Sequence, residues 1–207
     1  FDVAWAELRH RQRWRGDLTF KRGRTDAAFV AATALIAVPD EEGRTSGFAA
    51  LFQDVTEHRK SEAHMRHRAY YDALTALPNR DLFSERLSQA ITEARRHHHL
   101  AAVLYIDVDK LKVIDDQYGH AAGDAALKTT AQRLSECIRA HDTVARVAGD
   151  EFAVVLTDAD EPQHVATVVE KLLARFGEAM TIEDREVYTT LSIGVALYPT
   201  DAGDGET

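Results

Sequence analysis

The sequence predicts an α+β protein built around an antiparallel sheet. Residues 187–197 carry Val, Thr, Leu, Ile, Val and Leu at every second position, as a half-buried strand does. Residues 165–176 carry apolar side chains three and four positions apart, as an amphipathic helix does. Two apolar runs flank a short Gly-Asp turn at residues 148–151, which is typical of a β-hairpin. From residue 100 onward the elements follow the order β-α-β-β-α-β, the order of a ferredoxin-like sheet with its helices on one face.

The first part of the chain, residues 1–56, is predicted to be rich in β-structure. Its apolar segments have the length and composition of strands, and they lie at residues 17–20, 28–38 and 47–52. A Pro-Asp-Glu-Glu-Gly segment before the last of them is a turn by composition. Residues 57–71 are densely charged, without Pro or Gly, and have a thin apolar seam through Met65 and Ala69. We expect an exposed connector helix there, which pairing with a second copy of the chain could stabilise.

The elements of the second part follow in order from Asn79. This residue can cap a helix, and the apolar face of that helix consists of Phe83, Leu87, Ile91 and Ala94. Residues 100–108 are almost wholly apolar and predict a buried strand. A second helix carries apolar side chains at helical spacing, at Leu127, Ala131, Leu134 and Ile138. The hairpin at 143–156, the helix at 165–176 and the strand at 187–197 complete the sheet.

Composition limits the partners and the location of the chain. The 207 residues carry a net charge of −9, which argues against a nucleic acid polymer as a partner because recognition of its phosphates needs a basic surface. Cys137 is the single cysteine, so no intrachain disulfide can form, and we expect a cytoplasmic location. The apolar run at residues 27–38 is too short to span a bilayer. We expect the chain to be a piece of a longer protein, whose other parts could include a membrane anchor.

Acidic side chains gather at two places where strands are predicted to end. Asp107 and Asp109 close the apolar strand at 100–108, and Asp150 and Glu151 lie in the turn of the hairpin. If the sheet brings both places together, their carboxylates form a hard-oxygen site suited to Mg²⁺ or Mn²⁺ and to the phosphates of a nucleotide. The alternative is a solvated turn and a capped strand end, because short acidic motifs often occur by chance.

Several motifs occur in a fixed order along the second part of the chain. They are Asp-Ala-Leu-Thr-Ala-Leu-Pro-Asn-Arg at residues 72–80, Asp-Val-Asp through Gly-His to Gly-Asp at 107–124, Ala-Gly-Asp-Glu-Phe at 148–152, and Ser-Ile-Gly-Val-Ala through Tyr-Pro at 192–199. Together they resemble the GGDEF domains of the bacterial diguanylate cyclases, and this resemblance implies a sheet of the nucleotidyl-cyclase type.

The segment before these motifs resembles the C-terminal half of a PAS sensor domain. The resemblance rests on Gly47 and Phe48 in the last strand and on the exit motif Asp-Val-Thr-Glu-His-Arg at residues 54–59. The two resemblances together imply the C-terminal part of a PAS domain at residues 1–56 and a signalling helix at 57–71. They also imply a GGDEF domain at 72–207 whose C-terminal helix is missing.

The resemblance to GGDEF domains implies that two GTP molecules condense into cyclic di-GMP between the two protomers of a homodimer. The metal, Mg²⁺ or Mn²⁺, would bind to Asp107, Asp150 and the backbone carbonyl of Val108. Glu151 would be a second ligand or the general base for the attacking 3′-hydroxyl. Lys112 would contact a phosphate as a point charge. The catalytic residues implied are therefore Glu151, Asp150 and Lys112.

The nucleotide-binding residues implied by the resemblance include two departures from the family. Asp124 would accept hydrogen bonds from the guanine base, and Gly149 would allow the hairpin backbone to approach the phosphates. Asp115 stands where the family has Asn, and a carboxylate can accept but not donate a hydrogen bond. The alternative for Asp115 is a carboxylate at a helix end that faces water. Ala148 replaces the first Gly of the loop, and its methyl group would interfere if the residue needs a positive φ or must contact the triphosphate.

Arg139 and Asp142 precede the hairpin turn at the spacing of the family's product-inhibition site. The resemblance implies that both contact bound cyclic di-GMP, and the alternative is a surface ion pair at a helix end, which contributes little. Three functions therefore remain open. The chain is a PAS-regulated diguanylate cyclase, or a degenerate module that binds GTP or cyclic di-GMP and regulates a neighbouring domain such as a downstream phosphodiesterase. The third is a PAS-driven dimerisation scaffold that binds no nucleotide.

Overall fold

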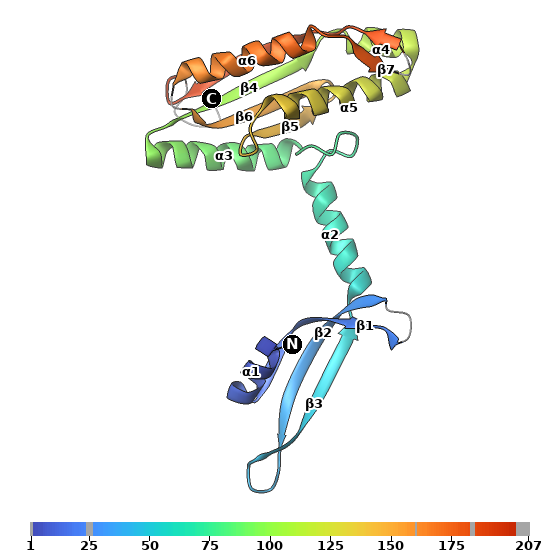
Figure 1. The fold of residues 1–207 in the computed structure, drawn as a ribbon, viewed down its shortest axis with the longest axis vertical. Helices are drawn as coiled ribbons and strands as arrows, with labels where there is room; N and C mark the ends of the chain where they lie inside the picture. The colour runs from blue at the N-terminus through green and yellow to red at the C-terminus, as the bar shows by residue number, and fades with distance from the viewer. Residues whose placement is uncertain (1, 24–26, 160, 183–184, 202–207) are drawn as a thin grey trace. The chain divides into compact units, whose positions relative to one another are not determined.

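The computed structural model describes residues 2–23, 27–159, 161–182 and 185–201. The chain divides into two compact units, Phe1–Arg66 and His67–Thr207, and each is described by itself (Figure 1). The predicted end of the second domain, at residue 207, lies outside the described residues. Among the described helices, none is both long and apolar enough to cross a lipid bilayer.

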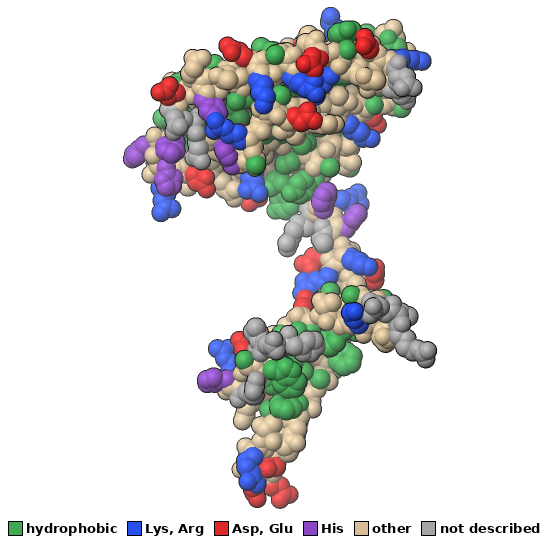
Figure 2. All heavy atoms as spheres, in the orientation of Figure 1, with side chains coloured by type: hydrophobic (Ala, Val, Ile, Leu, Met, Phe, Trp, Pro, Cys, Tyr) green, Lys and Arg blue, Asp and Glu red, His purple; other side chains and the backbone are tan. Residues whose placement is uncertain are grey.

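The N-terminal unit contains a three-stranded antiparallel sheet in the order β1-β2-β3. Its elements are α1 (Asp2–Arg11), β1 (Arg13–Lys21), β2 (Ala28–Pro39) and β3 (Thr45–Asp54). The strand predictions are confirmed, and each strand is longer than its apolar segment. The helix α1 was not predicted. Its buried side chains, Ala4 and Leu8, are a single pair one turn apart, which is too few to show a helical pattern in the sequence. Hydrophobic side chains remain exposed on β2 and β3 (Figure 2), and they are Ile36, Val38, Phe48, Leu51 and Phe52.

The predicted connector helix is α2 (Thr56–Tyr70). Its start is capped by Asp54, whose Oδ1 accepts a hydrogen bond from the backbone N–H of Thr56 at 3.0 Å. Arg59 then forms an ion pair with Asp17 of β1 at 2.9 Å, which fixes the first turns of the helix to the N-terminal sheet. Met65 is 62% exposed, so the thin apolar seam is not buried within this chain.

The C-terminal unit is built on a four-stranded antiparallel sheet in the order β5-β6-β4-β9. The strands are β4 (Leu100–Val108), β5 (Thr143–Ala148), β6 (Glu151–Ala159) and β9 (Leu191–Tyr198). The helices are α3 (Arg80–His97), α4 (Leu111–Tyr118), α5 (His120–Cys137) and α6 (Pro162–Phe176). This arrangement confirms the α+β class and the predicted β-α-β-β-α-β order.

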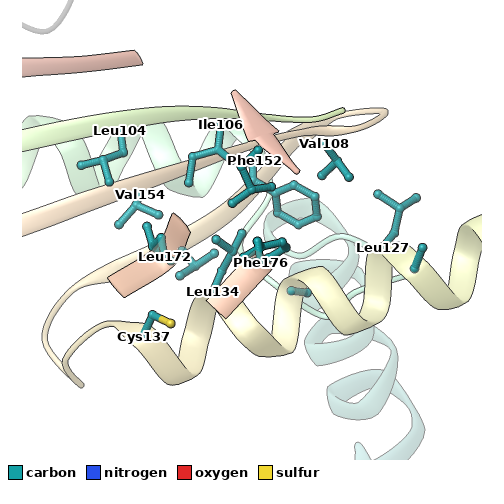
Figure 3. Close-up of a cluster of buried hydrophobic side chains, with 14 of the residues drawn as sticks. Leu104, Ile106, Val108, Leu127, Leu134, Cys137, Phe152, Val154, Leu172 and Phe176 are labelled. Carbon is teal, nitrogen blue, oxygen red and sulfur yellow. The ribbon is translucent and has the colours of Figure 1, made fainter. Parts of the chain in front are cut away.

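The two faces of this sheet are covered by different helices. Alternate residues of β4, including Leu104 and Ile106, pack with α5 and α6 in the larger core, where Phe152 is fully buried (Figure 3). The helices within the β-α-β-β-α-β order therefore lie on one face, as predicted. The preceding helix, α3, covers the other face, where it packs against Ala101 of β4 and Ala153 of β6. Asn79 caps α3 as predicted, because its side chain accepts hydrogen bonds from the backbone N–H groups of Asp81 and Leu82.

One strand prediction was wrong in its extent. Val187 belongs to a separate short hairpin, which consists of β7 (Met180–Ile182) and β8 (Arg185–Val187), and β9 begins only at Leu191. The residues between β8 and β9 leave the ladder because they bind the end of β4 instead. Thr189 donates a hydrogen bond from Oγ1 to the carbonyl oxygen of Asp109 at 2.7 Å. The alternation of apolar and polar side chains continues from β8 into β9, so the sequence pattern did not reveal that the strand is interrupted.

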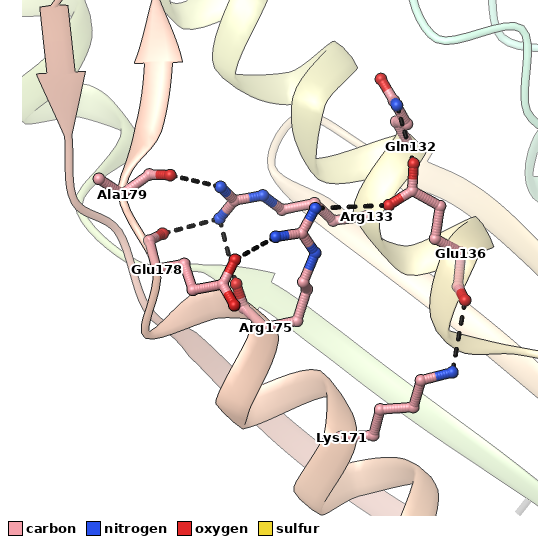
Figure 4. A network of polar contacts seen from close by, with 7 residues as sticks. All are labelled: Gln132, Arg133, Glu136, Lys171, Arg175, Glu178 and Ala179. Atoms are coloured by element: carbon pink, nitrogen blue, oxygen red, sulfur yellow. Dashed lines mark hydrogen bonds and ion pairs between the residues drawn. The ribbon is translucent and has the colours of Figure 1, made fainter.

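A buried arginine closes the end of α6 (Figure 4). Arg133 of α5 is 6% exposed and donates hydrogen bonds to the backbone carbonyls of Arg175, Glu178 and Ala179. These carbonyls lie at and just beyond the last turn of the helix, where the helix itself supplies no donors. The guanidinium group therefore joins α5 to the turn that leads into β7.

We expect Arg133→Met to lower the unfolding free energy by about 2–3 kcal/mol, because it leaves buried carbonyl groups without a donor while it retains an apolar stem. Urea denaturation followed by circular dichroism measures this change. Arg175→Met is the matched control, since the Arg175 side chain is 37% exposed and its partners Glu136 and Glu178 lie at the surface. Equal losses in the two variants would contradict the capping role of Arg133.

Candidate functional site

The sheet brings the two acidic strand ends together. In the ladder between β4 and β6, Asp107 lies directly opposite Glu151. The backbone N–H of Val108 donates to the carbonyl oxygen of Asp150 at 3.2 Å. The end of β4 therefore lies beside the tip of the β5-β6 hairpin. The carboxylates of Asp107, Asp150 and Glu151 are thus brought to one edge of the sheet, where these strands end.

Negative charge accumulates at this edge around Asp107. Burial, and then the charges of Asp150, Asp109 and Glu151, raise the pKa of Asp107. In the described part of the chain, no group of three or more His, Cys, Asp or Glu side chains is arranged to hold a metal ion by itself. A magnesium ion that is shared with a nucleotide needs only one or two carboxylates, because phosphate and water oxygens complete its coordination. The residues present therefore fit a divalent cation that binds together with a triphosphate.

Asp109 differs from Asp107 in its hydrogen bonds, although both residues lie at the end of β4. Its carboxylate accepts hydrogen bonds from the hydroxyl groups of Thr190 at 2.5 Å and Ser192 at 2.8 Å. These two hydrogen bonds lower the pKa of Asp109. Asp109 therefore ties the end of β4 to the start of β9, whereas Asp107 remains exposed and without such partners among the contacts described.

The hairpin tip requires glycine at one position only. Gly149 has φ +48, and a Cβ added there would meet nothing within 4 Å, so the left-handed backbone rather than crowding favours glycine. Ala148 ends β5 and pairs with Glu151, and it is not among the residues with positive φ. The backbone therefore accommodates the alanine that replaces the first Gly of the loop.

Arg146 links the hairpin tip to the start of the C-terminal unit. Its Nε and Nη2 donate to the carbonyl oxygen of Gly149 at 2.9 and 2.7 Å, and its Nη1 donates to Oδ1 of Asp72 at 3.0 Å. Burial alone would raise the pKa of Asp72, but hydrogen bonds from Thr75 and the Arg146 guanidinium lower it on balance. We did not identify Arg146 from the sequence. The available signal was a charged residue inside an otherwise apolar strand.

Asp115 of α4 is partly buried against the next helix. A Cβ added to Gly123 of α5 would lie 1.9 Å from Oδ1 of Asp115, so the Asp115 side chain occupies this position only because residue 123 is glycine. His120 lies beside the same carboxylate, with Nδ1 at 3.6 Å from Oδ1. The Asp115 side chain is 26% exposed, so it is partly buried where α4 meets α5 and only partly faces water. Asp124 follows Gly123 and is exposed, as is Lys112 at the start of α4.

Arg139 and Asp142 lie in the loop between α5 and β5, but they do not form the surface ion pair considered above. Asp142 accepts hydrogen bonds from the backbone N–H groups of Arg139 at 3.0 Å and Thr157 at 3.1 Å. Its side chain is 3% exposed, so it fixes the loop to β6. The Arg139 guanidinium lies 3.4 Å from His164 of α6, and both line a cavity of about 300 Å³ together with Lys171.

We expect Asp107→Asn to raise the melting temperature of the metal-free protein at neutral pH by about 1–2 °C in low salt. The pKa of Asp107 is higher in the folded chain than in the unfolded chain, so its ionised form opposes folding above that pKa. This cost, and therefore the gain in the variant, disappears as the pH falls toward about 4.

Differential scanning fluorimetry across this pH range measures the effect. Asp109→Asn is the matched control, and it lowers the melting temperature at neutral pH because the pKa of Asp109 is lowered by its hydrogen bonds. A destabilised Asp107→Asn variant would show that the acidic edge is balanced within the chain.

Comparison with known proteins places these features in a family. Residues 69–207 match the family described as diguanylate cyclase, GGDEF domain. The chain is 42% identical over 182 residues to the bifunctional diguanylate cyclase/cyclic di-GMP phosphodiesterase MucR of Pseudomonas aeruginosa. This alignment covers 87% of the chain and 25% of MucR. The chain is also 42% identical over 141 residues to the diguanylate cyclase TpbB of the same organism. That alignment covers 68% of the chain and 32% of TpbB.

Solved structures agree with this assignment. The GGDEF domain of TpbB (YfiN) has a TM-score of 0.62 at 40% identity, over 64% of this chain and 79% of that domain. A sensory box/GGDEF family protein of Caulobacter crescentus also has a TM-score of 0.62, at 37% identity, over 64% and 86% of the two chains. The chain spans 25% of the length of MucR and 32% of that of TpbB. It belongs to the GGDEF domain family, the family of the diguanylate cyclases.

Proposed function

We propose that this chain condenses two molecules of GTP into cyclic di-GMP. The observation that carries the proposal is the meeting of Asp107 and Glu151 across β4 and β6, beside Asp150 at the hairpin tip. The negative charge gathered around Asp107 suits a cation that arrives with a triphosphate. Membership of the diguanylate cyclase family supports the same reaction.

Asp107, Asp150 and the backbone carbonyl of Val108 would hold Mg²⁺ or Mn²⁺. Such an ion, when bound, neutralises charge on the triphosphate and on the leaving pyrophosphate. Glu151 accepts the proton of the attacking 3′-hydroxyl or serves as a further ligand, and Lys112 contacts the phosphates. Each 3′-oxygen forms a bond to the α-phosphorus of the other GTP as pyrophosphate departs. Each protomer holds one GTP in this proposal, so the reaction requires a homodimer.

Two carboxylates would read the guanine base. Asp124 is exposed at the start of α5, and the Asp115 carboxylate lies against Gly123, the residue before it. Both can accept from the donors of guanine, but neither can donate to its ring nitrogen N3. A carboxylate in place of the Asn also adds a negative charge to the proposed site, which opposes binding of a guanine acceptor group. Base recognition is therefore the weakest part of the proposed GTP site.

The loop that contains Arg139 would bind the product. Arg139 and Lys171 supply positive charge to the cavity beside α6, which suits the phosphates of cyclic di-GMP. Asp142 contributes by holding the loop, because both of its carboxylate oxygens already accept backbone hydrogen bonds. This assignment differs from direct contact of Asp142 with a guanine base.

Residues 1–56 would be the C-terminal part of a PAS sensor, and α2 would carry its signal to the cyclase in the cytoplasm. The antiparallel sheet of the N-terminal unit and the capped start of α2 support this assignment. The alignment with MucR is longer than residues 69–207, so part of the preceding segment is similar as well.

A second function is favoured by one specific observation. Asp115 replaces the Asn of the family, and its partly buried position against Gly123 leaves little room for the side chain to turn away. A chain with weakened GTP recognition would act as a binding module that responds to GTP or cyclic di-GMP and regulates a neighbouring domain, such as a phosphodiesterase. A scaffold that binds neither nucleotide is the remaining alternative.

Incubation with GTP and Mg²⁺ tests the proposal, with chromatography to follow the product. We expect cyclic di-GMP from the chain and at least a hundredfold less from Glu151→Gln, which keeps the shape of the side chain but cannot accept the proton. Binding of GTP or cyclic di-GMP by calorimetry without any product would overturn the enzyme and support the binding module. Absence of both product and binding would leave the scaffold.

We expect Asp115→Asn to strengthen GTP binding about five- to tenfold, because the amide gains a donor for N3 and removes a negative charge from the proposed base site. Isothermal titration calorimetry with GTP and Ca²⁺ measures the dissociation constant. Asp116→Asn is the control, since it removes the same charge from the neighbouring exposed position of α4. Equal gains in both variants would attribute the effect to overall charge rather than to the base contact.

A further inference from the structure

Tyr105 makes a contact at the acidic edge that the proposed reaction does not yet use. It lies two residues before Asp107, on the same face of β4. Its hydroxyl group donates a hydrogen bond to Oε2 of Glu151 at 2.9 Å. In the ladder Tyr105 lies opposite Ala153, so this bond runs diagonally from β4 to the first residue of β6.

We propose that Tyr105 is a positioning residue for Glu151. Its hydroxyl group holds Oε2, so that Oε1 is the oxygen presented to the substrate and the metal. This inference rests on the proposed function and adds a residue that selects which of the two oxygens takes part. Glu151 then acts through one oxygen in a fixed orientation, rather than as a freely rotating carboxylate.

The need for such a contact follows from the charges around Glu151. Like charges directly opposite each other in an antiparallel pair repel, and Asp107 is the residue opposite Glu151. A glutamate side chain also has several rotatable bonds, and holding it in one orientation costs conformational entropy. A hydrogen bond to an ionised acceptor is stronger than one between neutral groups, so the tyrosine hydroxyl offsets both effects.

Tyr105 is the donor in this hydrogen bond, because a phenol carries an O–H group whereas an ionised carboxylate can only accept. Its ring is 45% exposed, so loss of the hydroxyl group alone leaves the packing of the sheet unchanged.

The test compares Tyr105→Phe, Glu151→Ala and the double variant. We expect Tyr105→Phe to lower kcat about tenfold while KM for GTP changes less than twofold, because the ring remains and only the orientation of Glu151 is lost. Thermal unfolding without GTP or metal provides the second readout. There, Tyr105→Phe lowers the melting temperature in the wild-type background and leaves it unchanged in the Glu151→Ala background.

Tyr188→Phe is the matched control, since it removes a hydroxyl group from a ring that is 69% exposed, and its kcat equals that of the wild type. If Tyr105→Phe retains full kcat in an active chain, the positioning role is wrong and the proposed function stands. Equal thermal effects of Tyr105→Phe in both backgrounds would also overturn it, because the hydroxyl would then act independently of Glu151. If the wild-type chain makes no product, the proposed function itself fails, and the positioning role fails with it.

Discussion

The guanidinium group of Arg146 holds together the segments on which the acidic edge depends. It binds the carbonyl oxygen of Gly149 with two donors and the carboxylate of Asp72 with a third. The Arg146 side chain is 14% exposed, so loss of either charged partner would leave the other largely removed from water and uncompensated. Gly149 immediately precedes Asp150 and Glu151, so the placement of both acids depends on this contact.

The fold treats neighbouring carboxylates in opposite ways. Asp109 is satisfied by two hydroxyl groups of the adjoining segment, and its pKa is lowered. Asp107 lies two residues earlier and faces Glu151, and its pKa is raised by burial and by the surrounding acids. One aspartate therefore stabilises the folded chain while the other opposes it. An arrangement that costs stability in the free protein is consistent with a site that gains its compensating charge from a bound cation.

Much of the fold could be predicted because its signals are local. The hairpin turn at 148–151 and the helical spacing at 165–176 each depend on residues close in sequence. The hairpin of β7 and β8 has three residues in each strand, too few to show a pattern. The convergence of the acids followed from strand order, but the partner of Arg146 lies 74 residues earlier and no spacing indicates it. The burial of Asp142 was equally hidden, because its role depends on the backbone of Thr157 in another strand.

Asp115 shows how one substitution can be accommodated in shape and still change the chemistry of a site. Asp and Asn have nearly the same volume, and Gly123 provides the space that either side chain needs. The fold therefore places no steric barrier against the carboxylate. The difference is that a carboxylate has no donor and carries a charge, whereas the amide of Asn can donate as well as accept and is neutral. His120 lies beside the same oxygen and offers a positive charge when protonated, so the electrostatics of this position depend on a neighbour as well as on Asp115. In the proposed GTP site, the change from Asn to Asp at position 115 thus alters the hydrogen bonding and the charge of one partly buried side chain, and not the architecture that carries it.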